Sequence, residues 1–404
     1  MGASRKYCGA ADIGTTTLEL SILKEDGTVL ASRREWNTQK KYGADVVTRL
    51  AGGAGGGWKR VSKTLVSQLQ NGFSVLCREA GIVPEEMDRI ALSGNTVMLH
   101  YAAGLNPTGL GTAPFQGESL FGMEKTDSRN GIRIYFAPCI GAYAGGDLVS
   151  GILACGLKNG PGNVLLADIG TNGEIAVWNG KQLLVCSTSA GPAFEGIGIG
   201  CGMPALPGAV RRIAWSREAG FRYEVIGNGK PEGICGSGLM DLVAALLQSG
   251  ALEKSGRWNR ESAVFRECGF ENTGGSGIRL PGTELEISQK EIRQLQLAKG
   301  AIRAGMEMLL RKSGVRPDGL DRVILSGGFA EYTDPVSVLR IGLLPEGTGS
   351  RLCLDGNTSL RGAVLLAMFA EARLEAEETA AEARIVGLSG NREFNELFIE
   401  YLPF

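Results

Sequence analysis

The chain has 404 residues, of which 43% are hydrophobic and 21% charged, and its formal net charge is −1. This size and composition predict a globular protein with two domains and argue against the basic surface of a nucleic-acid-binding protein. The sequence has no apolar run long enough for a membrane span and no secretory apolar segment near Met1, so we expect a cytoplasmic protein without a membrane anchor.

The first predicted element is a strand that ends at Asp12 and is followed by Ile13, Gly14 and Thr15. A second strand is predicted at residues 18–22. A carboxylate at a strand end can hold a metal ion or its waters, and a glycine turn lets backbone N–H groups approach phosphate oxygens. Such turns also occur by chance, so one copy is weak evidence for a nucleotide site.

The same tetrapeptide recurs at residues 168–171, again between two strand-like segments. Residues 88–95 and 321–328 form a second pair of similar segments, each an apolar strand that runs into Ser-Gly. These segments start 76 residues after the first tetrapeptide (88 − 12) and 153 residues after the second (321 − 168). Internal repetition determines the architecture of a chain. We therefore predict two related α/β halves, with an insertion of about one subdomain in the second.

Other segments complete the predicted chain. A helix is predicted at residues 44–50, and the glycine run at 52–57 is predicted to be a flexible connection because glycine weakens regular structure. The small residues at 141–148 lead into an apolar helix. A long amphipathic helix is predicted to begin at Gln289 behind a capping box and to end before Gly314.

The cysteines and the histidine exclude several kinds of site. Nine cysteines are scattered along the chain without a C-x-x-C pair, which favours reduced, mostly buried thiols and neither a zinc nor an iron–sulfur site. His100 is the one histidine in the sequence, so a His-dependent catalytic triad and a multi-histidine metal site are excluded by counting. We predict that His100 is a packed or capping residue.

Ten motifs along the chain occur together in one known family. In chain order they are Asn37-x-Gln39-x-x-Tyr42-Gly43-x-Asp45, Ser93-Gly94-Asn95-Thr96-x-Met98-x-His100, Gly111-x-Ala113-Pro114-Phe115, Asp168-Ile-Gly-Thr-Asn-Gly-Glu174, Ala190-Gly-Pro-Ala-Phe-Glu-Gly196, Gly233-Ile-Cys-Gly-Ser-Gly238, Leu297-Ala-Lys299, Gly327-Gly-Phe329, Ile341-Gly-Leu-Leu-Pro345 and Gly356-Asn357. With these residues the chain resembles the actin/Hsp70/sugar-kinase ATPase superfamily. It is most similar there to the C-terminal ATPase region of the reductive activators of corrinoid proteins.

The resemblance implies the fold and its boundaries. The expected fold is α/β, with duplicated RNase H-like halves of the actin/Hsp70/sugar-kinase type around a central nucleotide cleft. Residues 1–155 would form the first half, and residues 156–356 the second, with an insertion at about 230–285. Residues 357–404 would form a helical segment that returns to the first half.

The resemblance also implies site residues for ATP and Mg²⁺. The first phosphate loop would be Asp12, Gly14, Thr15 and Thr16, and the second Asp168, Gly170, Thr171 and Asn172. Asp12 and Asp168 would also hold the metal. The adenosine-binding turn would be Gly327 and Gly328, with Gly233, Gly236 and Ser237 at the nucleotide-facing start of the insertion helix.

Two further assignments carry an alternative each. Asp147 falls where related ATPases place the carboxylate that orients the attacking water, but it could instead cap its helix. The loop at residues 187–195 contains small polar residues and an aromatic residue, Phe194, expected to be exposed. This loop is either a partner surface or a structural turn.

The implied activity is ATP-dependent reduction of a Co(II) corrinoid on a partner protein to Co(I). Members of the family commonly carry an N-terminal [2Fe–2S] domain, which this sequence does not show, so we expect a separate electron donor and no iron–sulfur cluster in this chain. Dimers are common among proteins with this ATPase fold. The alternatives are a small-molecule kinase on the same scaffold and a nucleotide-binding regulatory module with little turnover.

Overall fold

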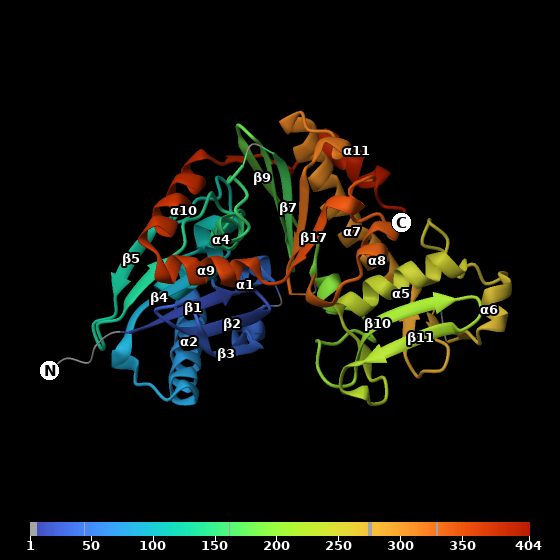
Figure 1. Cartoon of the computed structure of the whole chain (residues 1–404), viewed down its shortest axis with the longest axis horizontal. Helices are drawn as coiled ribbons and strands as arrows, with labels where there is room; N and C mark the ends of the chain where they lie inside the picture. Colours follow the sequence, from blue (N-terminus) through green and yellow to red (C-terminus); the bar gives the residue numbers. More distant parts are fainter. Residues whose placement is uncertain (1–5, 44, 161, 274–276, 329) are drawn as a thin grey trace. The chain divides into compact units, whose positions relative to one another are not determined.

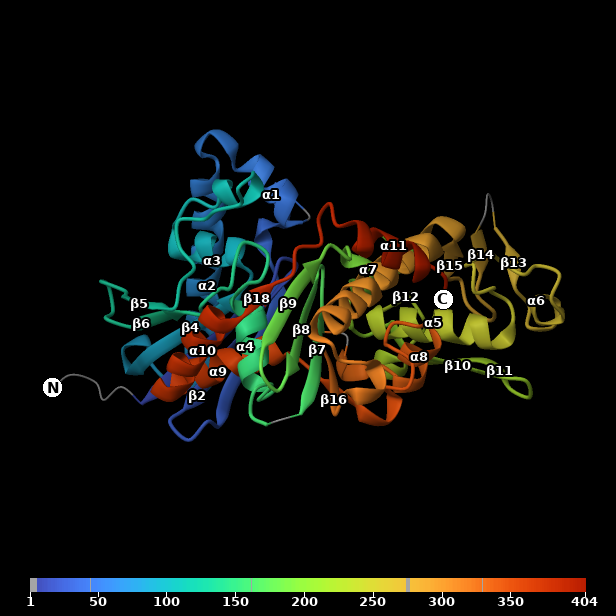
Figure 2. The same cartoon turned by 90° about the horizontal axis from the view of Figure 1, so that it is seen from above.

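The computed structural model describes residues 6–43, 45–160, 162–273, 277–328 and 330–404. It divides into two compact units, whose elements are shown in Figures 1 and 2. Unit 1 contains Met1–Gly160 and Asn357–Ile385, and unit 2 contains Pro161–Gly356 and Val386–Phe404. The last 48 residues of the chain therefore contribute to both units.

Unit 1 is built on a mixed sheet with the strand order β3-β2-β1-β4-β6-β5. Its strands are β1 (Tyr7–Ile13), β2 (Thr17–Lys24), β3 (Val29–Trp36), β4 (Met87–Gly94), β5 (Met123–Thr126) and β6 (Arg133–Phe136). Strands β1, β2 and β3 are antiparallel, whereas β4 and β6 run parallel to β1. The helices are α1 (Val46–Gly52), α2 (Trp58–Ala80), α3 (Thr96–Ala103), α4 (Gly146–Ala154), α9 (Thr358–Met368) and α10 (Ala370–Glu382).

Both faces of this sheet are buried. Ala11 and Ile13 of β1 pack into a core that includes residues of α2 and α3. Cys8 and Ala10 alternate with them along the strand and pack into a second core with residues of α4, α9 and α10. Figure 1 shows α9 and α10 beside α4, although they are far apart in the sequence. The end of β1 at Asp12 is thus held from both sides.

Unit 2 repeats the same arrangement of strands. Its sheet runs in the order β17-β16-β7-β8-β9, with β7 (Asn163–Ile169), β8 (Gly173–Asn179), β9 (Leu183–Thr188), β16 (Arg322–Ser326) and β17 (Leu352–Asp355). Helix α7 (Gln289–Ser313) packs on β8 and β9, and α11 (Arg392–Glu400) packs on α7. The two-residue strand β18 (Arg384–Ile385) precedes α11.

An additional subdomain lies between β9 and α7 in the chain. It contains β10 (Ala209–Ser216), β11 (Gly220–Val225), β12 (Gly233–Ile234), α5 (Gly236–Ser249), α6 (Ala263–Glu267), β13 (Glu271–Asn272), β14 (Gly277–Arg279) and β15 (Glu286–Ser288). These strands form two three-stranded sheets. Helix α5 packs on β10 and on α8 (Pro335–Arg340). This subdomain accounts for the longer spacing in the second half.

The strand register confirms the predicted duplication. Asp12 pairs with Ser93 across the parallel strands β1 and β4, and Asp168 pairs with Ser326 across β7 and β16. In the antiparallel direction Asp12 pairs with Glu19, and Asp168 with Glu174. Each tetrapeptide therefore meets its Ser-Gly strand in the same way in both units.

The glycine after each serine is required by the close approach of these strands. A Cβ atom built on Gly327 would lie 2.1 Å from the carbonyl oxygen of Ile169, and the residue has a φ of +117°. A Cβ atom built on Gly94 would lie 2.7 Å from the equivalent oxygen of Ile13. An L-amino acid with a side chain cannot occupy either position without moving the backbone.

Several local predictions are confirmed. Helix α7 begins with the Ser288–Glu291 capping box and ends at Gly314. His100 is buried and its Nδ1 atom lies 2.7 Å from the Thr96 carbonyl oxygen. Burial lowers the pKa of this imidazole. The cysteines are free thiols, and all except Cys268 and Cys353 are buried.

Two local predictions differ from the structure. The predicted helix at 44–50 is α1, shifted to Val46–Gly52, and Ala44 lies outside the described residues. The glycine run is not simply a flexible connection, because Ala54–Gly56 form a short 3₁₀ turn with Gly55 at a φ of +65°. In the part of the chain that the structure describes, no helix has the length and apolarity of a membrane span.

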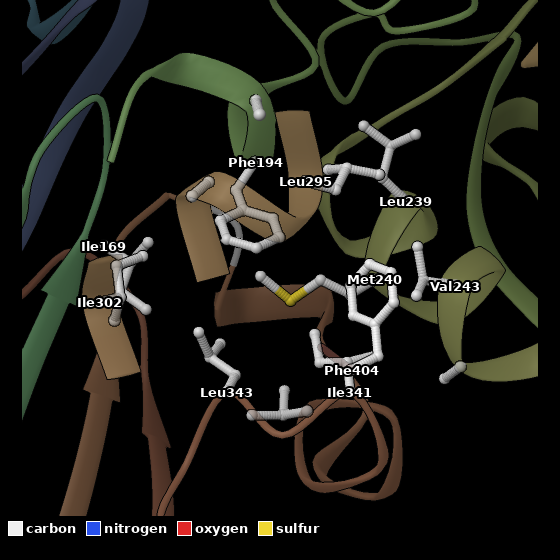
Figure 3. Close-up of a cluster of buried hydrophobic side chains, with 14 of the residues drawn as sticks. Ile169, Phe194, Leu239, Met240, Val243, Leu295, Ile302, Ile341, Leu343 and Phe404 are labelled. Atoms are coloured by element: carbon white, nitrogen blue, oxygen red, sulfur yellow. The ribbon is translucent and has the colours of Figure 1, made fainter. Parts of the chain in front are cut away.

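The central core of unit 2 shows one wrong prediction. Phe194 was expected to be an exposed aromatic residue of a partner-binding loop, but only 2% of its surface is accessible. Figure 3 shows its ring among Met240, Ile302, Leu343 and Phe404. The short 3₁₀ helix at Pro192–Glu195 packs on α5 and α7, which buries the ring. The loop at 187–195 is therefore a structural turn at this residue.

Candidate functional site

The carboxylate of Asp12 lies at the end of β1 and has a hydrogen-bond donor on each oxygen. Ser359 Oγ donates to Oδ1 at 2.7 Å, and Asn357 Nδ2 donates to Oδ2 at 2.9 Å. The same amide nitrogen donates to Glu19 Oε2 at 2.8 Å. Burial raises the pKa of Asp12, and the bonds from Ser359 and Asn357 act in the opposite direction. Two carboxylates thus share one amide donor.

A row of buried hydroxyl groups connects Asp12 with the start of α4. Ser93 Oγ lies 2.9 Å from Ser359 Oγ and 2.9 Å from Ser150 Oγ. It also donates to the carbonyl oxygen of Gly146 at 3.1 Å. These contacts satisfy the hydrogen-bonding groups of the buried serine side chains.

Asp147 is placed near Asp12 by α4. The N-cap position of this helix is Gly145, so Asp147 is not its N-cap, although its Oδ1 accepts the backbone N–H of Leu148 at 2.9 Å. Burial and the negative charge of Asp12 raise the pKa of Asp147 to about 7. A carboxyl group with this pKa can accept a proton near neutral pH. The structure therefore brings two of the predicted catalytic residues together in unit 1.

The turn after Asp12 contains Gly14, Thr15 and Thr16. Asn95 Nδ2 donates to Thr15 Oγ1 at 3.1 Å from the N-terminus of α3. Asn37 Nδ2 donates to the Gly14 carbonyl oxygen at 2.9 Å, and the Asn37 backbone N–H donates to the Thr16 carbonyl oxygen, also at 2.9 Å. These bonds fix the turn from the interior of unit 1.

The second hairpin places Asp168 at the end of β7 in unit 2. The Gly170 N–H donates to the Asn172 carbonyl oxygen at 2.8 Å, and Thr171 Oγ1 donates to Glu195 Oε2 at 3.0 Å. A Cβ atom on Gly327 would lie 3.2 Å from Asp168 Oδ1, so the Ser-Gly turn runs beside this carboxylate. Unit 2 thus brings Gly327 to the second hairpin.

The predicted adenosine segments meet around β10. Gly233 lies in β12, and Gly236 and Ser237 begin α5. Ser237 Oγ donates to the Arg211 carbonyl oxygen at 3.0 Å, and the Arg211 guanidinium lies 5.8 Å from the ring centre of Tyr332, which follows the Gly327–Gly328 turn. Gly328 is exposed, and Phe329 of the same motif lies outside the described residues.

Unit 2 contains a cavity of about 610 Å³. It is bounded by α5, α8, β10 and β11, with Trp215, Tyr223, Asp241, Gln248, Ser337 and Arg340 among its lining residues. The predicted glycines and Ser237 do not line it. Asp241 is 1% exposed, and burial raises its pKa, whereas the hydrogen bonds from Ser337 and from the Ile213 N–H act in the opposite direction. Arg212 bridges Asp241 and Asp334 at 2.9 and 3.1 Å.

The carboxylates fit Mg²⁺ held jointly with phosphate rather than a metal held by protein alone. The described residues contain no group of three His, Cys, Asp or Glu side chains that could hold a metal ion. Mg²⁺ commonly keeps several waters and takes one or two carboxylates plus phosphate oxygens. Asp12 and Asp168, each at a strand end beside a glycine turn, supply this kind of ligand.

Several residues around the two Asp-Ile-Gly-Thr hairpins had no role predicted from the sequence. Ser359 and Asn357, at the start of α9 and more than 300 residues away in the chain, contact Asp12. Asn357 had one signal, its place in the Gly356-Asn357 motif. Glu19 also had one, because it corresponds to Glu174 in the repeat.

The family model described as the RACo middle region matches residues 7–160, and that described as the C-terminal domain of RACo, the ASKHA domain, matches residues 162–404. The corrinoid activation enzyme RamQ of Eubacterium limosum is 32% identical over 382 residues, which cover 89% of this chain and 64% of RamQ. The [Co(II) methylated amine-specific corrinoid protein] reductase of Methanosarcina barkeri is 28% identical over 310 residues, which cover 68% of this chain and 54% of that protein.

The solved structure of a reductive activator for corrinoid,iron-sulfur protein matches with a TM-score of 0.90 and 31% identity. The match covers 100% of this chain and 67% of that one. These findings confirm the predicted resemblance and the actin/Hsp70/sugar-kinase type of fold. The chain spans less than two thirds of the length of the two curated relatives.

Replacement of Asn357 tests the shared amide donor. Asn357→Asp keeps the side-chain oxygen that caps α9 by accepting from Leu360 N–H, but it places a third carboxylate between Asp12 and Glu19. We expect the free energy of unfolding at pH 7.5 without Mg²⁺ to fall by about 1–3 kcal/mol. Repulsion between the carboxylates favours their protonated forms in the folded variant, so its loss of unfolding free energy becomes smaller as the pH falls towards 5.

The measurement is urea denaturation of both proteins at several pH values. Asn391→Asp is the matched control, because Asn391 caps α11 in the same way through Phe394 N–H. Asp and Asn are equivalent at this position of a helix, so the control should unfold like the wild type. Equal losses in the two variants would contradict a special role of the Asn357 amide.

Proposed function

Because the chain belongs to the family of reductive activators of corrinoid proteins, we propose that it is an ATPase that activates a corrinoid protein. ATP binding and hydrolysis would be coupled to reduction of Co(II) to Co(I) in that partner. The observation that carries the proposal is the repeated placement of Asp12 and Asp168 in equivalent registers, each beside a Gly-Thr turn. A separate electron donor, a cytoplasmic location and a possible homodimer are further parts of the proposal.

Each half-site has a task in this proposal. Asp12 and Asp168 hold Mg²⁺ or its waters, and bound Mg²⁺ would neutralise charge on the phosphates. The turn residues bind phosphate oxygens; they are Gly14, Thr15 and Thr16 in the first hairpin and Gly170, Thr171 and Asn172 in the second. Asp147 orients and deprotonates the attacking water, a role that its raised pKa supports.

The nucleoside end of ATP has a candidate pocket in unit 2. The cavity lies between α5, which starts at the predicted segment Gly236–Ser237, and α8, which follows the predicted Gly327–Gly328 turn. Its volume exceeds that of a nucleoside, and Trp215 and Tyr223 offer aromatic surface for a base. We propose that this cavity takes the base, with the two glycine segments beside the ribose.

The coupling is an exchange of free energy between nucleotide and partner. Cobalt gains one electron from the donor protein, while ATP and water become ADP and phosphate. A one-electron transfer changes its equilibrium constant tenfold for about 59 mV, so an uphill transfer of a few hundred millivolts requires several kcal/mol. If one nucleotide-bound state of this protein binds the reducible form of the corrinoid protein more tightly than its other forms, this difference in affinity can supply the free energy.

The direct test mixes the protein with Mg-ATP, a low-potential reductant and a Co(II) corrinoid protein from the same organism. We expect Co(I) absorbance to grow with phosphate release, and we expect neither with Asp168→Ala, because that substitution removes a metal and phosphate ligand. Phosphate release without Co(I) would contradict the corrinoid step. Phosphate transfer to a small hydroxyl compound would instead indicate a kinase, and tight ATP binding without turnover a regulatory module.

Filling the cavity tests the base pocket. Gln248 is exposed at the cavity and bonds to Arg340, so the larger side chain of Gln248→Trp should occupy space that the base needs. We expect the Kd for ADP, measured by calorimetry, to rise about tenfold or more. Lys181→Trp, in the exposed turn between β8 and β9, is the control and should bind ADP normally. Unchanged affinity in Gln248→Trp would show that the base binds elsewhere.

A further inference from the structure

Arg49 of α1 is a buried cation behind the first hairpin. Its side chain has no accessible surface and is among the largest fully buried side chains of the described residues. No ion pair to Arg49 is found among the residues that the structure describes; Asp45 favours its charge only from a distance. A buried guanidinium without a carboxylate partner is costly, and such a group needs a reason in the structure.

The guanidinium bonds to backbone carbonyl oxygens instead. Its Nη2 donates to the Thr15 oxygen at 2.5 Å, and its Nε donates to the Gly43 oxygen at 2.9 Å. Its Nη1 lies 3.4 Å from Gln39 Oε1 and 3.6 Å from the sulfur of Met98. Burial lowers the pKa of this group to about 10, so it remains charged near neutral pH.

The motif Asn37-x-Gln39-x-x-Tyr42-Gly43-x-Asp45 builds the surroundings of Arg49. Asn37 caps the 3₁₀ turn at Thr38–Tyr42, and Gln39 and Gly43 supply acceptors to the guanidinium. Asp45 forms a capping box that starts α1, the helix that carries Arg49. These residues are not among the proposed nucleotide contacts, and the contacts above indicate that the motif supports Arg49.

These bonds determine which way the hairpin backbone faces. Asn37 holds the Gly14 carbonyl oxygen, and Arg49 holds the Thr15 carbonyl oxygen. In a trans peptide the N–H of the next residue points the opposite way from the carbonyl. The N–H group of Thr15 therefore faces away from the Asn37 amide, and that of Thr16 faces away from the Arg49 guanidinium. Successive N–H groups in a turn form a binding site for an anion.

We propose that Arg49 is a positioning residue for phosphate binding at the first hairpin. It holds the Thr15 carbonyl inward, turns the following N–H group towards the bound phosphate, and adds a fixed positive charge behind the turn. The inference rests on the proposed binding of ATP at this hairpin. The second hairpin is different, since Thr171 bonds there to the carboxylate of Glu195.

The test compares Arg49→Met and Arg49→Lys with Arg89→Met. Arg89 is another buried arginine of unit 1, which pairs with Glu124 and does not contact the hairpin. We expect Arg49→Met to raise the KM for ATP about tenfold or more with kcat within about threefold, because the lost interaction acts on binding. Arg49→Lys keeps the charge and should recover part of the affinity. Arg89→Met should leave both constants unchanged.

A second readout does not depend on ATPase activity. Amide hydrogen exchange of residues 13–17 in the nucleotide-free protein should be about tenfold faster in Arg49→Met than in the wild type and in Arg89→Met. If the wild type hydrolyses no ATP, the proposed function fails, and the exchange rates still decide the role of Arg49. Unchanged exchange or unchanged KM in Arg49→Met would overturn the inference. If Arg49→Met does not fold, Arg49→Lys is measured in its place, and wild-type values would overturn the inference.

Discussion

The parallel pairing of each Asp-bearing strand with a Ser-Gly strand is the constraint on which the rest of the structure depends. In both units the aspartate pairs with the serine across the ladder, and the glycine that follows lets the two backbones approach closely. Helices cover both faces of the sheet in unit 1, so the strand ends have no freedom to shift register. The carboxylates are therefore placed by the core and not by the loops that surround them.

Burial raises the pKa of two carboxyl groups in unit 1, those of Asp12 and Asp147. Asp12 receives bonds from Ser359 and Asn357, which stabilise its charge, whereas Asp147 has one backbone donor and the repulsion of Asp12. The two carboxyl groups thus differ in the hydrogen-bond donors that they receive. Arg49 adds a charge of the opposite sign behind the same hairpin.

The sequence predicted the features that depend on short-range patterns. The two tetrapeptides, the two Ser-Gly strands and the capping box of α7 are each defined within about ten residues, and all appear where they were expected. The contacts of Ser359 and Asn357 with Asp12 could not be predicted, because they join residues more than 300 positions apart. Arg49 could not be assigned a role, because its shortest hydrogen bonds are to the backbone carbonyls of Thr15 and Gly43. Phe194 was misjudged because glycine and proline neighbours are typical of a surface loop, although tertiary packing buries the ring.

The proposed ATPase activity depends on Asp12 in unit 1 and on Asp168 in unit 2, and phosphate release by variants of these two residues tests this dependence. Steady-state hydrolysis would be compared in the wild type, Asp12→Ala, Asp168→Ala and the double variant, with folding checked by denaturation. Residues that act as one unit give losses that do not add. We expect each single variant to lose nearly as much ATPase activity as the double variant. A single variant with near-wild-type turnover, or losses that multiply in the double variant, would contradict it.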